Sequence, residues 1–235
     1  MKIALLGYGK MGKAIELIAL SRGHEIVLRA ETVVKPEQLS EVEIAIEFSV
    51  PEAAFSNITA ALEAGVPVVS GTTGWLKDYD KAVELCHQKK GAFIYASNFS
   101  LGVNIFFQIN EYLAKMMGNH SQYEVSMEEI HHVHKLDKPS GTAITLAEGI
   151  IKHTHKQHWA LDKSNSENIL IESKRIGEFP GTHTIRYHSD EDDLVLTHEA
   201  HNRNGFSLGA VTAAEWLSGK QGVFTMKDVL GLQNL

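Results

Sequence analysis

Short apolar runs alternate with amphipathic helical patterns through the first hundred residues. We predict buried strands over 2–6, 25–30, 43–48, 66–70 and 92–96, with helices over 11–22, 52–64 and 76–90. In the second of these helices Phe55, Ile58 and Leu62 share one face, and Gly65 follows as a helix-ending residue. Apolar strands that alternate with helices predict a parallel sheet covered on both faces. Only residues 31–42 join the second and third strands, which leaves room for a short helix at most.

The pattern changes after residue 100. A long amphipathic helix is predicted over 103–117, a strand around 123–127 and a second helix from Ser140. Three β-like runs follow at 169–176, 182–188 and 194–200, and an acidic turn at 190–193 separates the last two. A final helix is predicted over 208–217. We therefore expect an α/β chain in which a Rossmann-like parallel-sheet domain (1–101 plus 210–235) is joined to a second α+β domain (102–209) built on a mixed or antiparallel sheet.

Composition narrows the function classes. The chain has 235 residues, with 22 Lys and Arg against 29 Asp and Glu, and a net charge of −7 argues against a general nucleic-acid binder. The lone Cys86 excludes a disulfide framework and a thiolate zinc site, and indicates a reducing compartment. The sequence holds no apolar run of membrane-spanning length, and its first apolar stretch, Ile3–Leu6, is too short for a signal peptide. We expect a cytoplasmic protein that binds neither membrane nor nucleic acid.

A glycine-rich motif follows the first predicted strand and opens the first predicted helix. It reads Gly7, Tyr8, Gly9, Lys10, Met11, Gly12 and fits G-x-G-x-x-G. In this context the glycines allow a tight turn, a close approach of the backbone to a pyrophosphate and close helix–strand packing. The helix start offers free N–H groups to the phosphates. Glu31, at the end of the second strand, is the candidate for the ribose hydroxyls, with Thr32 or Val33 as alternatives if the register slips.

Two further loops are expected at the same edge of the sheet, because ligands of open α/β sheets bind beyond the carboxyl ends of the strands. The loop Gly71, Thr72, Thr73 follows the fourth strand and can present backbone groups to a ribose or nicotinamide, or can be an ordinary strand–helix turn. The loop Ala96, Ser97, Asn98, Phe99 follows the fifth strand. Asn98 can bond a carboxamide or cap the next helix. All of these loop residues are candidate cofactor contacts.

The segment from Glu129 to Thr142 concentrates groups suited to acid–base chemistry. His131 can donate or accept a proton near neutral pH, and Lys135 can serve as a second acid or an anion partner. Ser140 is a natural N-cap that leaves the Gly141 and Thr142 amides free to bind a carboxylate. A metal site is the rival interpretation, since His132 and His134 would share a face on a strand. The segment shows no evident carboxylate partner for them, and we expect no metal.

Several segments together resemble the 4-hydroxy-tetrahydrodipicolinate reductase family of bacterial lysine and diaminopimelate synthesis. The strongest resemblance lies in the pattern E-x-H-H-x-x-K-x-D-x-P-S-G-T-A that begins at Glu129. It continues nearly throughout the chain, in the segments 7–12, 47–51, 71–74, 98–104, 175–184 and 197–210.

The resemblance implies a two-domain oxidoreductase that uses NADH or NADPH, assembled as a homotetramer through the sheet of its second domain. The nicotinamide would deliver hydride to carbon 4 of a cyclic imine dicarboxylate, and a proton would complete the reduction to tetrahydrodipicolinate. Position by position, His131 matches the catalytic acid/base and Lys135 the proton donor. His132 matches a substrate contact, and Gly141 and Thr142 match the carboxylate cradle that Ser140 opens.

The sequence departs from the family pattern in three places. The glycine loop is one residue shorter than is common, and the segment after the second strand is much shorter. Arg29 precedes Glu31 and no basic residue directly follows it, which favours NADH over NADPH. Lys138 stands where a small apolar residue is more usual.

Two alternatives stay open. One is another two-domain NAD(P)-dependent amino-acid or semialdehyde dehydrogenase, although a semialdehyde enzyme needs a cysteine nucleophile on its second domain and Cys86 falls in a helix of the first. The other is a nucleotide sensor that keeps the fold without catalysis, which would have no use for His131 and Lys135.

Overall fold

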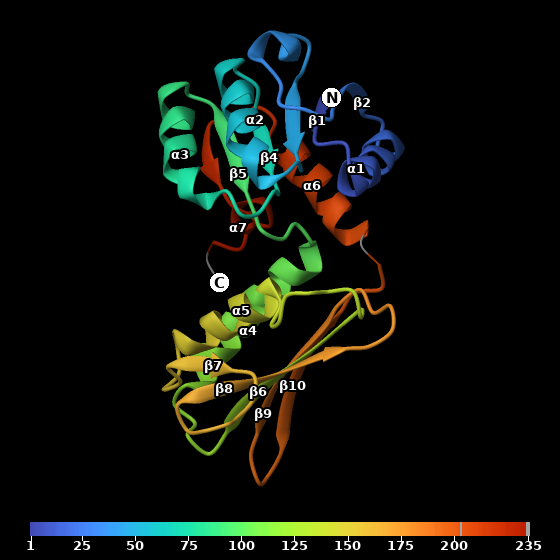
Figure 1. The fold of residues 1–235 in the computed structure, drawn as a ribbon. Coiled ribbons are helices and arrows are strands. Elements are labelled where there is room, and N and C mark those ends of the chain that lie inside the picture. Colours follow the sequence, from blue (N-terminus) through green and yellow to red (C-terminus); the bar gives the residue numbers. More distant parts are fainter. Residues whose placement is uncertain (203, 234–235) are drawn as a thin grey trace. The chain divides into compact units, whose positions relative to one another are not determined.

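The computed structural model describes residues 1–202 and 204–233. These residues form two compact units, one of 1–101 with 204–233 and one of 102–202 (Figure 1). The predicted second boundary, between 209 and 210, falls inside helix α6 (Asn204–Leu217), because that helix packs as a whole with the first unit. Among the described residues, no helix has the length and apolar character needed to cross a membrane.

The first unit is built on a six-stranded sheet in the order β11-β5-β4-β3-β1-β2, and each neighbouring pair is parallel. Its strands are β1 (Lys2–Leu6), β2 (Glu25–Ala30), β3 (Ile44–Glu47), β4 (Val68–Ser70), β5 (Ala92–Tyr95) and β11 (Gly222–Phe224). The strand order reverses at β1, which pairs with β2 on one side and β3 on the other. This is the topological switch point at which doubly wound sheets bind ligands.

Helices cover both faces of this sheet, as the continuous apolar strands predict (Figure 1). One face packs against α1 (Lys10–Ser21), α6 and α7 (Met226–Val229). The other face packs against α2 (Pro51–Glu63), α3 (Tyr79–Gln88) and the short 3₁₀ helix Pro36–Leu39. Every residue of β3 is buried, so this strand lies in the packed core and its carboxyl end lies at the switch point.

The second unit is a five-stranded mixed sheet with two helices on one face (Figure 1). Its strands follow the order β10-β9-β6-β8-β7: β10 (Asp193–Glu199), β9 (Thr182–His188), β6 (Glu124–His131), β8 (Asn168–Arg175) and β7 (His158–Ala160). The pairs of β9 are antiparallel, whereas β8 runs parallel to β6 and β7. Apolar residues of α4 (Leu101–Met117) and α5 (Gly141–Ile151) pack on the sheet around Ile171 and Ile185.

The α/β class and the mixed second sheet are confirmed, and the differences lie in short elements. Residues 76–90 form a 3₁₀ turn (Leu76–Asp78) before α3 rather than one helix. The short elements β7, β11 and α7 were not predicted, because three or four residues carry too little periodicity to be recognised. Strand β6 continues to His131 and then ends, so His132 and His134 lie in a turn and not on a common strand face.

Candidate active site

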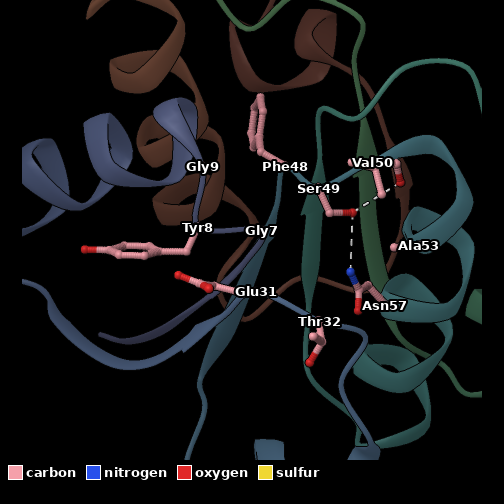
Figure 2. Close-up of a pocket in the computed structure, with 10 residues that line it drawn as sticks. All are labelled: Gly7, Tyr8, Gly9, Glu31, Thr32, Phe48, Ser49, Val50, Ala53 and Asn57. Atoms are coloured by element: carbon pink, nitrogen blue, oxygen red, sulfur yellow. Dashed lines mark hydrogen bonds between the residues drawn. The ribbon is translucent and has the colours of Figure 1, made fainter.

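A pocket of ≈ 320 Å³ lies at the switch point of the first unit (Figure 2). Three strand ends contribute to it: Gly7, Tyr8 and Gly9 follow β1, Glu31 and Thr32 follow β2, and Phe48, Ser49 and Val50 follow β3, with Ala53 and Asn57 added from α2. The sequence predicted Gly7, Tyr8, Gly9 and Glu31 as cofactor contacts. It gave Thr32 as an alternative to Glu31 at the ribose hydroxyls. The contribution of β3 and α2 was missed, because it depends on the strand order.

The three glycines of the motif have distinct structural reasons. Gly7 adopts φ +102°, and a Cβ there would lie 2.1 Å from the Phe48 carbonyl oxygen. A Cβ on Gly12 would lie 2.3 Å from the Gly7 oxygen. Around the Cβ position of Gly9, by contrast, no atom of the described chain lies within 4 Å, although Gly9 is the N-cap of α1. Gly7 and Gly12 are thus needed for packing, whereas Gly9 leaves open space at a helix N-terminus that suits a phosphate.

Tyr8 belongs to a charged cluster at the mouth of this pocket. Its hydroxyl donates to Glu16, which also accepts a hydrogen bond of 2.9 Å from Nε of Arg29. The guanidinium of Arg29 lies 6.0 Å from the centre of the Tyr8 ring. Hydrogen bonds from Arg29, followed by the one from Tyr8, hold the pKa of Glu16 below its usual range. Arg29 is therefore already engaged by a carboxylate of this chain.

The buried carboxylate of Glu47 links the loops around the pocket. It accepts hydrogen bonds from Ser70 Oγ (2.7 Å), Thr72 Oγ1 (2.9 Å) and the Ser49 backbone N–H (3.0 Å). The Ser49 N–H also donates to Thr72 Oγ1 at 2.8 Å. Thr72, predicted as a cofactor contact, thus uses its side chain to tie the 71–74 loop to the end of β3. Thr73 is exposed beside it, and Gly71 packs against the Phe48 ring.

Asn98 makes a local turn in the loop after β5. Its Oδ1 accepts a hydrogen bond of 2.9 Å from the Ser100 backbone N–H. Because Ser100 precedes α4 (Leu101–Met117), this bond caps no N–H of that helix, and the contact with a carboxamide stays a prediction. Phe99 is buried, with its ring centre 5.7 Å from that of Phe48. Ala96 and Ser97 stay on the accessible side of this loop. The loop is thus fixed to the pocket wall through Phe48, and its backbone follows the carboxyl end of β5.

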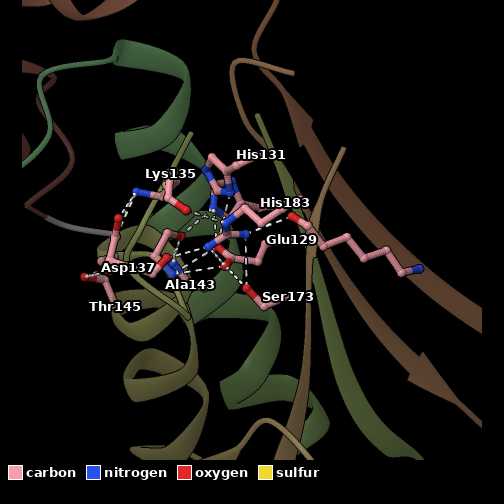
Figure 3. A network of polar contacts seen from close by, with 12 residues as sticks. Glu129, His131, Lys135, Asp137, Ala143, Thr145, Ser173 and His183 are labelled. Carbon is pink, nitrogen blue, oxygen red and sulfur yellow. Dashed lines mark hydrogen bonds and ion pairs between the residues drawn. The ribbon is translucent and has the colours of Figure 1, made fainter. Parts of the chain in front are cut away.

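A second polar centre lies in the second unit, at the end of β6 (Figure 3). Its hub is Glu129, whose side chain is fully buried. Both Glu129 oxygens lie 3.1 Å from the Ser140 backbone N–H, Arg175 Nη2 donates to Oε1 at 3.2 Å, and Ser173 Oγ donates to the same oxygen. The other oxygen, Oε2, lies 3.5 Å from His131 Nδ1 and 3.6 Å from His183 Nε2.

The surroundings of Glu129 and His131 lower the pKa of both side chains. Although burial opposes it, hydrogen bonds from His183, Ser140 and Ser173 hold the pKa of Glu129 well below its usual range. Burial, followed by the neighbouring His183, lowers the pKa of His131 to about 4, and Glu129 only partly offsets this. At neutral pH the centre therefore holds an ionised carboxylate and an uncharged His131 imidazole, which can accept a proton.

Lys135 lies in the turn after β6. Its Nζ donates to both oxygens of Asp137, each at 2.8 Å. Although burial opposes it, these hydrogen bonds hold the pKa of Asp137 below its usual range. The turn is fastened from β8, because Arg175 donates to the backbone oxygens of Lys135 (3.2 Å) and Asp137. Arg175 thus connects the Lys135 turn to Glu129.

The start of α5, where the anion cradle is predicted, is capped by a side chain. Ser140 is its N-cap, and Ser140 Oγ accepts a hydrogen bond of 3.2 Å from the Ala143 N–H. The first amides of a helix have no partner within it, so those of Gly141 and Thr142 remain for a ligand. His183 Nε2 lies 3.1 Å from Ser140 Oγ, which fixes the cap from β9. His132 is half-buried in the turn after β6, with its ring centre 6.2 Å from that of His134.

The rival metal interpretation takes a different form in the structure. The group with metal-like spacing is Glu129, His131 and His183, whose potential ligand atoms lie within 4.8 Å of one another. This group contains neither His132 nor His134, and its carboxylate comes from Glu129, two residues before His131 on the same face of β6. However, Arg175, Ser173 and the Ser140 N–H already donate to Glu129, and the Arg175 charge opposes a divalent cation at this point. The donors present fit a hydrogen-bonded hub better than a metal site.

Sequence reasoning missed Ser173, Arg175 and His183 at this centre. They reach Glu129 and His131 through strand register, since Glu129 pairs with Ser173 on β8 and with His183 on β9, and His131 pairs with Arg175. Alternation along β6 was the signal that could have placed Glu129 beside His131. The cross-strand partners had no local signal.

Cys86 does not meet the requirements of a catalytic nucleophile. It is fully buried in α3, and burial raises the pKa of its thiol. A nucleophilic cysteine needs an accessible thiolate. This excludes the semialdehyde dehydrogenase alternative in its cysteine-dependent form.

Comparisons with known proteins agree with the motifs. The models for the N-terminus and C-terminus of dihydrodipicolinate reductase match residues 1–99 and 102–230. A 4-hydroxy-tetrahydrodipicolinate reductase of Christiangramia forsetii is 54% identical over 233 residues and 98% of each chain. One of Archaeoglobus fulgidus is 40% identical over 81% of this chain and 76% of the other. The solved structure of a dipicolinate-bound dihydrodipicolinate reductase from Paenisporosarcina sp. matches 96% of this chain and 97% of its own, with a TM-score of 0.79 at 21% identity. The chain belongs to the dihydrodipicolinate reductase family, also called 4-hydroxy-tetrahydrodipicolinate reductases, as its motifs predicted.

Proposed function

We propose that the chain is a 4-hydroxy-tetrahydrodipicolinate reductase, which reduces a cyclic imine dicarboxylate with NAD(P)H to tetrahydrodipicolinate in lysine and diaminopimelate synthesis. The observation that carries this proposal is the gathering of His131, Lys135 and the capped start of α5 at one end of β6. A relative 54% identical over nearly the whole chain supports it. The pocket at the switch point of the first unit supports it as well, because a dinucleotide would bind there.

The residues at the switch point fit a dinucleotide. The open space at Gly9 lets the pyrophosphate approach the amides of Lys10 and Met11, and Gly12 lets α1 start close to β1. Glu31 and Thr32 both line the pocket, and Glu31 would accept hydrogen bonds from the ribose hydroxyls. The loops 71–73 and 96–99 follow neighbouring strands and would line the nicotinamide end. When bound, the reduced nicotinamide supplies the hydride that carbon 4 of the substrate receives.

The second unit supplies the protons and the substrate contacts. Loss of water from the 4-hydroxy substrate leaves an imine conjugated with a ring double bond. Its reduction places hydride on carbon 4 and then needs a proton at the neighbouring ring carbon. Neutral His131 can hold and return a proton at that carbon, and Lys135 Nζ can donate one. The amides of Gly141 and Thr142 would bind one substrate carboxylate, and His132 would contact the ring or the second carboxylate. That a relative was solved with dipicolinate, a planar dicarboxylate, supports this substrate class.

NADH is the favoured cofactor in this proposal. A 2′-phosphate needs an available cation beside the ribose site, but Arg29 is engaged by Glu16. We further propose a homotetramer that forms through the face of the second sheet opposite α4 and α5. A shallow pocket on that sheet is lined by Ser126, Glu128, Thr184 and Arg186, together with the half-exposed Val195.

The test is a coupled assay in which the preceding synthase forms the substrate from pyruvate and aspartate semialdehyde. Oxidation of NADH and of NADPH is followed in parallel. We expect turnover with both synthase substrates present and none when either is omitted. Oxidation of NADH with an amino acid or a keto acid in place of the cyclic imine would instead favour another amino-acid dehydrogenase.

A further inference from the structure

The carboxylate of Glu129 serves two parts of the centre at once (Figure 3). On one side, Oε2 lies 3.5 Å from the Nδ1 atom of His131, a buried atom that has no hydrogen-bond partner within the described residues. On the other side, both oxygens receive the backbone N–H of Ser140, the residue that caps α5. Glu129 is fully buried, so it is not exposed to a bound substrate. It can act on the reaction only through these neighbours.

An ionised carboxylate beside Nδ1 selects one form of a neutral imidazole. A carboxylate only accepts hydrogen bonds, so it stabilises the tautomer with the proton on Nδ1 and leaves a lone pair on Nε2. The distance of 3.5 Å is long for a hydrogen bond, as is common before a ligand tightens such a site. The Nε2 atom faces Gly181, where a Cβ would come within 3.0 Å of it. The basic nitrogen is therefore the one that points away from the buried carboxylate.

The charges around the ring agree with this assignment. Lys135 and Arg175 both disfavour a proton charge on His131, and His183 lies against it with a ring-centre distance of 5.0 Å. Glu129 is the one partner in this group whose charge attracts a proton to the ring. Because its Oε2 faces Nδ1, that attraction acts on Nδ1 rather than on Nε2.

We propose that Glu129 is a positioning residue for the reduction, which fixes the Nδ1–H tautomer of His131 and at the same time anchors the N-terminus of α5. One buried charge then sets both the atom that exchanges the proton and the amides that hold the substrate carboxylate. The role in turnover rests on the proposed function. The tautomer and the anchoring do not, because they are properties of the ligand-free protein.

The first measurement needs no variant. In full-length protein labelled with ¹⁵N-histidine, ring-nitrogen chemical shifts report which nitrogen carries the proton, and the His131→Gln variant assigns the signal. We expect a protonated Nδ1 and an unprotonated Nε2 on His131 at neutral pH. A His131 ring protonated on Nε2 would overturn the proposal, whatever the enzyme turns over.

The second measurement uses Glu129→Gln, which keeps the size of the side chain and removes its charge. We expect kcat to fall about 10²-fold, the scale for a misplaced acid–base group, and KM for the cyclic imine to rise while the Kd for NADH stays unchanged. The His131 signal should shift towards the Nε2–H form. Glu129→Asp, which retains the charge, should restore part of kcat. Glu148→Gln, the same change on the exposed side of α5, is the matched control and should leave all values unchanged.

Each result bears on the proposal separately. If Glu129→Gln keeps wild-type kcat and the wild-type tautomer, Glu129 does not position His131. If that variant fails to fold by circular dichroism, the wild-type tautomer and Glu129→Asp decide. If the wild type itself does not reduce the cyclic imine, the proposed function fails, and the nitrogen shifts still test the tautomer.

Discussion

At the residue scale, His131 and Lys135 are expected to matter for turnover and not for nucleotide binding. Both lie in the second unit, whereas the glycine motif lies in the first. His131→Gln and Lys135→Ala should therefore bind NADH with the wild-type Kd but lose about 10²-fold or more in kcat. Steady-state kinetics combined with NADH fluorescence titration separates the two effects. Wild-type turnover in both variants would remove these residues from the mechanism.

The lowered pKa of His131 also predicts how stability depends on pH. The unfolded imidazole titrates near 6.5 and the folded one at about 4, so the folded state binds fewer protons between these values. The contribution of His131 to the free energy of unfolding is therefore complete above the unfolded-state pKa. As the pH falls towards the folded-state pKa, this contribution is lost, and the loss is on the order of 2–3 kcal/mol. Protonation of Glu129 lowers the stability only at more acidic pH, because the pKa of this carboxyl is 4.5 in the unfolded state and lower in the folded state.

Urea unfolding followed by circular dichroism at neutral pH and near pH 5 measures this effect. We expect His131→Gln to flatten the decrease in the free energy of unfolding between the two conditions. His120→Gln, a change at an exposed histidine, should leave the decrease as in the wild type. An unchanged decrease in His131→Gln would show that His131 is not held neutral by the fold.

Cofactor choice can be tested at Glu16. Its carboxylate holds Arg29 beside Tyr8, which lines the pocket at the switch point. Glu16→Gln weakens that ion pair and frees the guanidinium to reach a 2′-phosphate, so KM for NADPH should fall severalfold while KM for NADH changes little. The double variant with Arg29→Ala should lose the gain. If NADPH kinetics do not respond to Glu16→Gln, the Glu16–Arg29 pair has no part in cofactor selection.

At the scale of elements, two glycines at the start of α1 are expected to have different roles, Gly12 in packing and Gly9 in nucleotide binding. Gly12→Ala places a methyl group against the Gly7 backbone oxygen and should destabilise the protein by about 1–3 kcal/mol. Gly9→Ala meets no described atom of the chain and should cost at most about 1 kcal/mol as an N-cap change. It should nevertheless raise the Kd for NADH at least about tenfold, because the methyl group occupies the space assigned to the pyrophosphate.

Thermal unfolding and NADH titration on the two variants distinguish these effects. The expected pattern is a lowered Tm for Gly12→Ala and weakened NADH binding at near-wild-type Tm for Gly9→Ala. Tight NADH binding by Gly9→Ala would place the pyrophosphate elsewhere.

The same elements show how far sequence reasoning reaches. Strands β1, β2 and β9 have the predicted bounds, because buried apolar runs and alternation are local signals. The glycine motif and the 129–142 segment were recognised because each is also a local pattern in the sequence. The Glu129 hub was not assembled in advance, since Ser173 and His183 join it only through the register of β6 with β8 and β9. A register of that kind depends on tertiary pairing and leaves no trace within one strand.

At the scale of the whole molecule, the chain returns to its first unit after the second is complete. Helix α6 packs on the same sheet face as α1, and β11 extends that sheet beside β5. The apolar pattern predicted this helix from residue 208, but its start at Asn204 was not recognisable because residues 204–207 lack a clear apolar period. Within the described residues, the chain leaves the first unit after Leu101 and is back in it from Asn204.

The division of the chain into two units leads to a prediction about motion. In the proposed reaction the hydride comes from a cofactor bound by the first unit, and the proton groups belong to the second. We therefore expect that cofactor and substrate together favour a closed state of the protein that excludes water. Small-angle scattering of the intact protein should show a smaller radius of gyration with NADH and dipicolinate together than with either alone. Dipicolinate mimics the substrate but accepts no hydride under these conditions, so the closed state should persist through the measurement. Superimposable profiles in all four states, ligand-free included, would contradict a ligand-dependent closure.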